Sequence, residues 1–120
     1  IHFITETERV RKLAAEVKEH DYTNFEKAVT DSGLSSWRFL QNCATPDPKH
    51  QGIALFLAMN EIYFQNHKGV CRVHGGGFAG SILSVIPKEE SPAFRAFLKD
   101  VLKNEYYEIH MRDAGSVKVF

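Results

Sequence analysis

The spacing of apolar residues near the start of the chain predicts a helix of about four turns. Val10, Leu13, Ala14 and Val17 recur at i, i+3, i+4 and i+7, which places them on one helix face. Thr5 has the spacing of a capping box with the acidic residue three positions later. The other face is polar, and its glutamates are expected in solvent (Glu6, Glu8 and Glu16).

Helical spacing continues to about residue 65. A second helix is expected to be capped by Asp21 and to stop near Gly33, and the serines at 35 and 36 are expected to cap a short turn after it. Thr45-Pro-Asp-Pro48 then breaks the pattern, and its Asp47-Pro48 pair predicts the start of a helix that extends to about Gln65. Because this helix is apolar on most sides, we expect it to be the central buried helix.

After Gly69 the period changes to the two-residue period of strands. Residues 70–73 and 82–86 predict a hairpin, and Ser91-Pro92 predicts the cap and first turn of a helix that ends at Leu102. Strands are expected at 106–111 and 117–120, with a turn at 113–115 between them. The pattern predicts a single α+β domain over residues 1–120, in which helices pack on an antiparallel sheet.

Composition then narrows the function classes. Fifteen basic and fifteen acidic residues cancel, so charge gives no case for binding nucleic acid or an anionic membrane. The longest apolar stretch, Ile53 to Met59, is too short to span a bilayer. Cys43 and Cys71 form neither a disulfide framework nor a Cys-x-x-Cys pair, and no signal peptide is expected, so we predict a cytoplasmic protein with reduced thiols. Because the chain starts at Ile1 rather than Met, we expect it to be part of a longer protein.

The most informative segment is Arg72-Val-His-Gly-Gly-Gly-Phe-Ala-Gly80. Glycine adopts positive φ without steric cost and has no Cβ, so such a run marks a tight turn or the close approach of another group. Between two strands it is either a hairpin turn or a loop whose N–H groups converge on a phosphate. It fits neither the P-loop, because no Gly-Lys-Ser/Thr follows, nor a dinucleotide fingerprint, because a strand-like run follows where a helix would begin.

Other candidate catalytic groups are sparse. The six histidines show neither His-x-x-x-His nor His-x-His spacing, so no metal site is expected. Ser32, Ser35 and Ser36 lie outside any nucleophile-elbow motif, and helix capping explains them better. His74 adjoins the glycines, where its ring is expected to donate to a phosphate or to a backbone carbonyl.

Segments in order along nearly the whole chain resemble the galactokinases, a branch of the GHMP family of sugar and small-molecule kinases. Residues 72–81 resemble the third signature of that family, which in galactokinases reads Arg-Met-Thr-Gly-Gly/Ala-Gly-Phe-Gly-Gly. Residues 2–10 are similar to a segment in which a histidine precedes a helix carrying Glu-x-x-Arg-Val, residues 21–33 to the next helix, and residues 109–119 to the terminal strand pair. His74 stands where the family has threonine, and Ala79 where it has glycine.

The resemblance implies that the chain is the C-terminal, ferredoxin-like domain of a galactokinase-like enzyme, and that the N-terminal nucleotide-binding domain is absent from it. The loop residues that would shape the phosphate pocket against that missing domain are Gly75, Gly76, Gly77 and Gly80, with His74 beside them. The implied reaction transfers the γ-phosphoryl group of ATP, with Mg²⁺, to the anomeric hydroxyl of a hexose, with galactose the expected sugar. The resemblance places the catalytic aspartate and the nucleotide loop upstream, so no catalytic or metal-binding residue is expected here and the isolated chain is expected to be inactive.

Two other functions stay open. One is a galactokinase-like regulator that binds sugar and ATP without turnover. The other is a ferredoxin-like interaction or ligand-binding module whose glycine hairpin is a coincidence. For such a module we expect a stable monomer with a loop capped by its own side chains, whereas a sizeable apolar patch beside the loop would indicate a lost interface.

Overall fold

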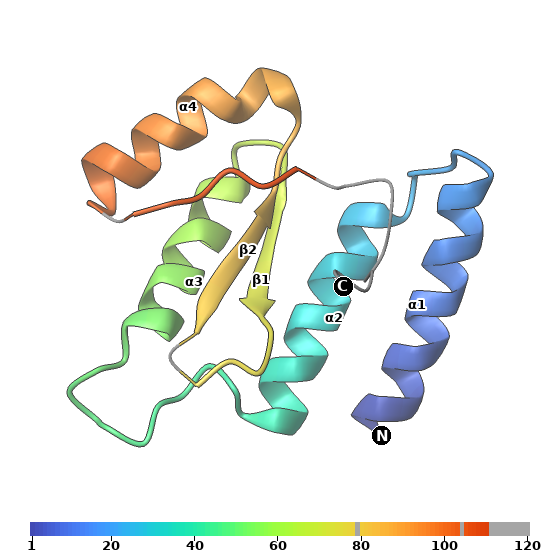
Figure 1. Cartoon of the computed structure of the whole chain (residues 1–120), viewed down its shortest axis with the longest axis horizontal. Helices are drawn as coiled ribbons and strands as arrows, with labels where there is room; N and C mark the ends of the chain where they lie inside the picture. The colour runs from blue at the N-terminus through green and yellow to red at the C-terminus, as the bar shows by residue number, and fades with distance from the viewer. Residues whose placement is uncertain (79, 104, 111–120) are drawn as a thin grey trace, which may run out of the picture.

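In the computed structural model, the described residues (1–78, 80–103 and 105–110) form four α-helices and a two-stranded antiparallel sheet (Figure 1). In chain order the elements are α1 (His2–Lys18), α2 (Phe25–Leu40), α3 (Gly52–Phe64), β1 (Val70–His74), β2 (Ser81–Val85), the 3₁₀ turn η1 (Lys88–Glu90), α4 (Ser91–Ala96) and the π-helical turn η2 (Phe97–Val101). The expected α+β class, with helices packed on an antiparallel sheet, is confirmed at this level.

Two helices, α2 and α3, pack directly against the sheet. α2 packs along β1, α3 packs on both strands, and α1 packs on the outer side of α2 (Figure 1). The core forms where α3 and the end of α2 meet β1, and its buried members are Cys43, Ile53, Leu57, Cys71 and Val73. The strand that carries the glycine loop is therefore the best buried part of the sheet, because Val73 is fully buried one residue before the strand ends.

α1 begins earlier than predicted, so the expected capping box at Thr5 is wrong. Its first residue is His2, and the Thr5 hydroxyl donates to the carbonyls of Ile1 and His2 from inside the first turn, at 3.3 and 3.1 Å. A threonine hydroxyl inside a helix bonds in this way to a carbonyl three or four residues earlier. The helix is nevertheless where the apolar period places it.

α2 differs from the prediction at both ends. It starts at Phe25, because Asp21 accepts the N–H of Thr23 in a turn at 3.0 Å rather than capping the helix. It also passes through Gly33 without a break. A Cβ at position 33 would lie only 2.9 Å from the Cβ of Arg72, so this glycine allows the helix to lie close to β1 rather than ending it.

α3 is buried on one face only, so the expectation of a central buried helix is half right. Ile53 and Leu57 face the core, whereas Leu55 and Ile62 are each 59% exposed. It begins at Gly52, not at Asp47-Pro48, since Asp47 accepts the N–H of Lys49 at 2.9 Å within the preceding loop.

Aromatic stacking attaches the last helix to α3. Tyr63 stacks on Phe97 with ring centroids 4.5 Å apart, and Phe64 stacks on Phe94 at 5.2 Å. The predicted helix start at Ser91-Pro92 is confirmed to within one residue, with Pro92 in the first turn. The strand predicted at 106–111 is wrong over 106–110, where the backbone has no regular secondary structure; residue 111, the turn at 113–115 and the strand at 117–120 lie outside the described residues.

Candidate functional site

The glycine segment is the connection of a β-hairpin. β1 and β2 pair antiparallel with His74 opposite Ser81, so the six residues 75–80 form the loop. The predicted hairpin is therefore confirmed, and the loop lies at the end of the sheet where α2 finishes (Figure 1).

The four glycines of the loop have different surroundings. Gly75 and Gly77 have positive φ values of 63° and 78°, which glycine adopts without strain. A Cβ built at Gly75 or Gly76 meets no described atom within 4 Å beyond its chain neighbours. At Gly77, by contrast, it would overlap the backbone oxygen of Asn42 and lie 2.7 Å from the Asn42 Cβ. At Gly80 it would lie 3.2 Å from the carbonyl oxygen of Gly77.

Asn42 supports the second half of the loop, and sequence reasoning missed it. The N–H of Phe78 donates to the Asn42 carbonyl oxygen at 2.7 Å, and Phe78 itself has a positive φ of 55°. The contact joins positions 36 residues apart, so no local spacing could have pointed to it. The Phe78 side chain is 55% exposed, which means that the bond fixes the backbone of the loop rather than burying a side chain.

His74 lies at the base of the loop with an exposed side chain. Its ring makes no hydrogen bond or ion pair with any of the described residues. The imidazole is therefore accessible to a ligand at the loop. Ala79, the other departure from the family signature, is not among the described residues.

The start of α3 forms the other side of this region, which the sequence patterns had not connected with the glycines. A cavity of about 750 Å³ is lined by Lys49, His50 and Gln51 together with Gly80 and Ser81 at the end of the loop, and it extends toward α4. The first amides of a helix carry partial positive charge and lack intrahelical acceptors. The ammonium group of Lys49 adds positive charge to this side of the loop, and the lining of the cavity also includes the carboxylate of Glu105.

Charge at this helix start is partly compensated. His50 and Asp47 are paired at 2.6 Å, and the N–H of Lys49 donates to the same carboxylate. These bonds, chiefly the one from Lys49, lower the pKa of Asp47 below its usual value. Asp47 therefore stays ionised near neutral pH and holds the loop before α3 in place. The ammonium group of Lys49 has no partner among the described residues.

A polar cluster joins α1, α2 and β1, and it corrects the expectation that Glu6 is solvated. Glu6 pairs with Arg9, accepts a bond from the Ser32 hydroxyl and lies 3.6 Å from Arg72, which itself bonds to Ser32. Its side chain is only 23% exposed. Since each charge in this cluster has an opposite charge or a hydroxyl as partner, the cluster is a packing contact between elements and not a free anion site.

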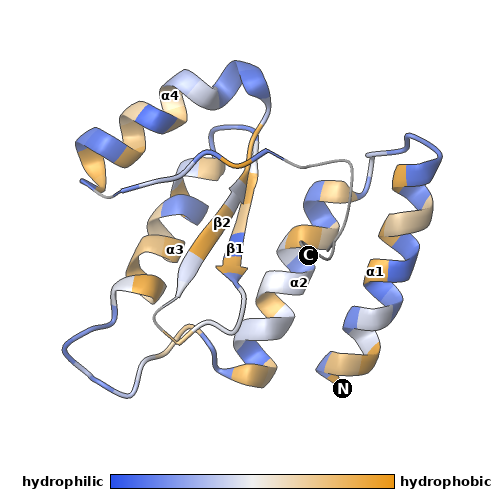
Figure 2. Cartoon of the chain, viewed as in Figure 1, coloured by the Kyte–Doolittle hydropathy of each residue, from blue (hydrophilic) through white to orange (hydrophobic). Residues whose placement is uncertain are grey.

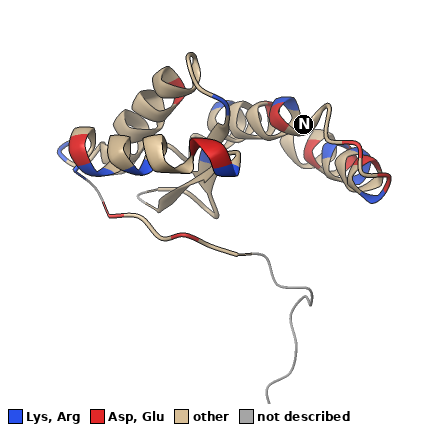
Figure 3. Cartoon of the chain, turned by 90° about the horizontal axis from the view of Figure 1, so that it is seen from above, with Lys and Arg blue, Asp and Glu red and all other residues tan. Residues whose placement is uncertain are grey.

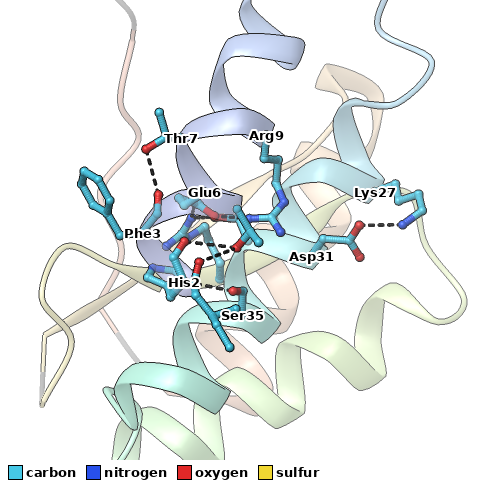
Figure 4. Close-up of polar contacts among 12 residues, drawn as sticks. His2, Phe3, Glu6, Thr7, Arg9, Lys27, Asp31 and Ser35 are labelled. Carbon is cyan, nitrogen blue, oxygen red and sulfur yellow. Dashed lines mark hydrogen bonds and ion pairs between the residues drawn. The ribbon is translucent and has the colours of Figure 1, made fainter.

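The serines predicted as caps are buried inside α2 instead. The ring of His2 is hydrogen-bonded to the Ser35 hydroxyl at 2.9 Å (Figure 4). One residue further along, the Ser36 hydroxyl accepts a bond from the side-chain amide of Asn42 at 2.6 Å. The amide that bonds to Ser36 cannot act as a base. The Ser35 hydroxyl does lie beside an imidazole, but it is buried, so it is not presented to a substrate as a nucleophile would be.

The cysteines are also poor candidates for chemistry. Burial, with a smaller contribution from Glu61, raises the pKa of Cys71 to about 12, and burial likewise raises the pKa of Cys43. Both are therefore neutral thiols near neutral pH, and the thiolate is the reactive form. Among the described residues no group of three or more His, Cys, Asp or Glu side chains is placed to hold a metal ion.

A large apolar surface lies next to the loop. A hollow of about 910 Å³ lies between the N-terminal part of α1 and the end of α2. Its apolar lining residues are each about half exposed or more: Ile1, Phe3, Val10, Phe39 and Leu40. Orange segments mark this region in Figure 2, at the ends of α1 and α2 nearest the N-terminus. Leu40, at the edge of this hollow, lies two residues before Asn42 in the chain.

Charged residues of both signs are interspersed along α1 (Figure 3). No helix among the described residues is both long and apolar enough to cross a membrane.

No protein-family model, curated protein or solved structure matches this chain. Chemically, the loop offers exposed backbone at Gly75 and Gly76 and an accessible imidazole at His74, which are groups able to contact a phosphate.

Proposed function

We propose that this chain is the C-terminal part of a galactokinase-like GHMP kinase and that its glycine loop forms one wall of the phosphate pocket. The observation that carries the proposal is the combination of unobstructed backbone at Gly75 and Gly76 with a firm support under Gly77. The ordered resemblance of the flanking segments to galactokinases gives the reaction class.

The chemistry of phosphoryl transfer fits such a division of labour. Catalysis of this reaction rests on positioning and on stabilising the negative charge of the transferred group, so one domain is able to supply a wall of backbone N–H groups while another supplies the remaining contacts. The proposed role of this chain is to place Gly75, Gly76 and the ring of His74 against the phosphates of ATP. The described residues contain no carboxylate cluster suited to Mg²⁺, so in this proposal the ligands of that ion belong to the upstream part of the protein.

The exposed apolar surface favours this proposal over a self-contained interaction module. Single exposed apolar residues are common on ordinary protein surfaces, whereas the hollow beside Phe39 and Leu40 gathers several of them in one place. In the proposal, the missing N-terminal domain covers it and closes over the loop. The buried free thiols of Cys43 and Cys71 are compatible with a reducing compartment, and we propose the cytoplasm.

The test is an ATP-dependent phosphorylation assay of the full-length protein that the proposal implies, against a panel of hexoses that includes galactose. The 120-residue chain is assayed beside it. We expect the full-length protein to form sugar 1-phosphate and to require Mg²⁺ for it. We expect the 120-residue chain alone to form no sugar 1-phosphate.

The other outcomes separate the alternatives. Binding of sugar and ATP without turnover would replace the enzyme by a galactokinase-like regulator. Failure to bind either ligand, together with a stable monomeric 120-residue chain, would replace it by an interaction module. Turnover by the isolated chain would contradict the division of labour between two domains.

A further inference from the structure

Asn42 is positioned by a buried contact within its own chain. Its side-chain amide donates to the Ser36 hydroxyl at 2.6 Å, and both residues are only 2% exposed. The side-chain oxygen of Asn42 is 3.9 Å from the sulfur of Cys43, close enough to accept a weak hydrogen bond from the thiol. Since the backbone leaves α2 through the left-handed conformation of Gln41, with φ of 55°, the Ser36 bond determines where Asn42 points after that turn.

The backbone of Asn42 in turn holds the glycine loop. Its carbonyl accepts the N–H of Phe78 at 2.7 Å, and its Cβ and oxygen fill the space that a side chain at Gly77 would need. A series of contacts thus runs from Ser36 through Asn42 to Phe78. The loss of such a buried hydrogen bond is costly, because the polar group that remains is buried without any hydrogen-bond partner, not even water.

We infer that Ser36 and Asn42 are positioning residues for the phosphate loop. They fix its second half, and the first half, Gly75 and Gly76, is thereby presented with open space around it. This inference rests on the proposed function, because the loop needs a defined conformation for binding only if it contacts a phosphate. Neither residue touches the ligand in this account; both act through the backbone of Gly77 and Phe78.

The neighbouring serine offers a matched control. Ser35 lies on the same helix, is also buried and makes one side-chain hydrogen bond, but its partner is His2 of α1. Replacing either serine by alanine removes one hydroxyl from the interior of α2. Only the Ser36 bond leads to the glycine loop.

The experiment compares Ser36→Ala with Ser35→Ala in the full-length protein. The first readout is KM for ATP against kcat, and the second is hydrogen exchange of the Phe78 amide. For Ser36→Ala we expect KM to rise about 5- to 10-fold, the cost of one buried hydrogen bond, with kcat changed less than about twofold. We expect Phe78 exchange to accelerate by a similar factor, whereas Ser35→Ala leaves KM and Phe78 exchange within about twofold of the parent.

Each result decides a separate point. Equal effects of the two variants on KM and on Phe78 exchange would overturn the positioning role. If the parent has no kinase activity but Phe78 exchange separates the variants, the proposed function fails and the support of the loop by Ser36 stands. If Ser36→Ala does not fold, Ser36→Cys takes its place. The cysteine side chain is slightly larger than that of serine and its sulfur is a weak acceptor, and the same contrast is expected at smaller size.

Discussion

The three consecutive glycines of the loop have opposite surroundings in its two halves. Gly77 lies against Asn42 so closely that no Cβ fits, and the following N–H is bonded to the same residue. Gly75 and Gly76 have no described atom within 4 Å of a Cβ position beyond their chain neighbours. One half needs glycine to pack against the protein, whereas at the other half the absence of a Cβ leaves room for something else to approach. A run of identical letters thus serves two different requirements.

The comparison predicts that Gly77→Ala has the largest effect on stability. The new Cβ would overlap the Asn42 backbone, and alanine would also take the positive φ of 78°. Overlap and strain together are expected to lower the free energy of unfolding by about 3 kcal/mol. Chemical denaturation of the 120-residue chain measures it, and a loss no greater than that of Gly76→Ala would mean that Asn42 does not support the loop.

Gly75→Ala is expected to have an intermediate effect. Its φ of 63° is strained for alanine, but the Cβ would point into open space. The strain alone corresponds to about 1 kcal/mol. The same denaturation series applies, and a loss as large as that of Gly77→Ala would show that the first half of the loop is also packed.

Gly76→Ala is expected to have the smallest effect of the three on stability. Gly76 has no positive φ and no described atom within 4 Å of its Cβ position beyond its chain neighbours. Its change in unfolding free energy should stay within about 0.5 kcal/mol of zero. Under the proposed function the same methyl group faces the phosphate, so it should raise KM for ATP in the full-length protein although stability is unchanged. A variant that leaves both quantities unchanged would contradict a phosphate at this position.

The core under the supported half predicts a pH dependence of stability outside the neutral range. Because burial raises the pKa of Cys71 to about 12 from an ordinary 9.0, the folded state keeps a proton that the unfolded state loses. This contribution is fully present below about pH 9 and is lost as pH rises toward 12. Denaturation of Cys71→Ala against the parent should therefore show a difference that is constant from pH 6 to 8 and shrinks above pH 9. A constant difference at all pH values would rule out the shift.

Local patterns predicted the elements that depend on neighbouring residues. The apolar period of α1, the strands around the glycines and the helix start at Ser91-Pro92 all follow from spacing within a few positions. Gly33 was predicted to end a helix, but it lies inside α2, where β1 packs closely against it. A glycine that ends a helix and a glycine that allows a strand to pack against the helix cannot be told apart in sequence.

The support of the loop could not be read from the sequence. Ser36 has the local signature of a cap, and its partner Asn42 is set by the left-handed turn at Gln41. The bond from Phe78 to Asn42 spans 36 positions and uses a backbone oxygen, which every residue type carries. The glycines marked where the site lies; only the fold shows which of them are open.

Hydrogen exchange of the loop amides in the full-length protein, with and without a non-hydrolysable ATP analogue and Mg²⁺, tests the central claim most directly. Without ligand, the Phe78 amide should already be protected by Asn42, and the amides of Gly75 and Gly76 should exchange fast. With ligand, the two glycine amides should slow by about fivefold or more, and Phe78 should change little. Saturating nucleotide that leaves Gly75 and Gly76 unprotected would contradict the assignment of this loop to the phosphate pocket.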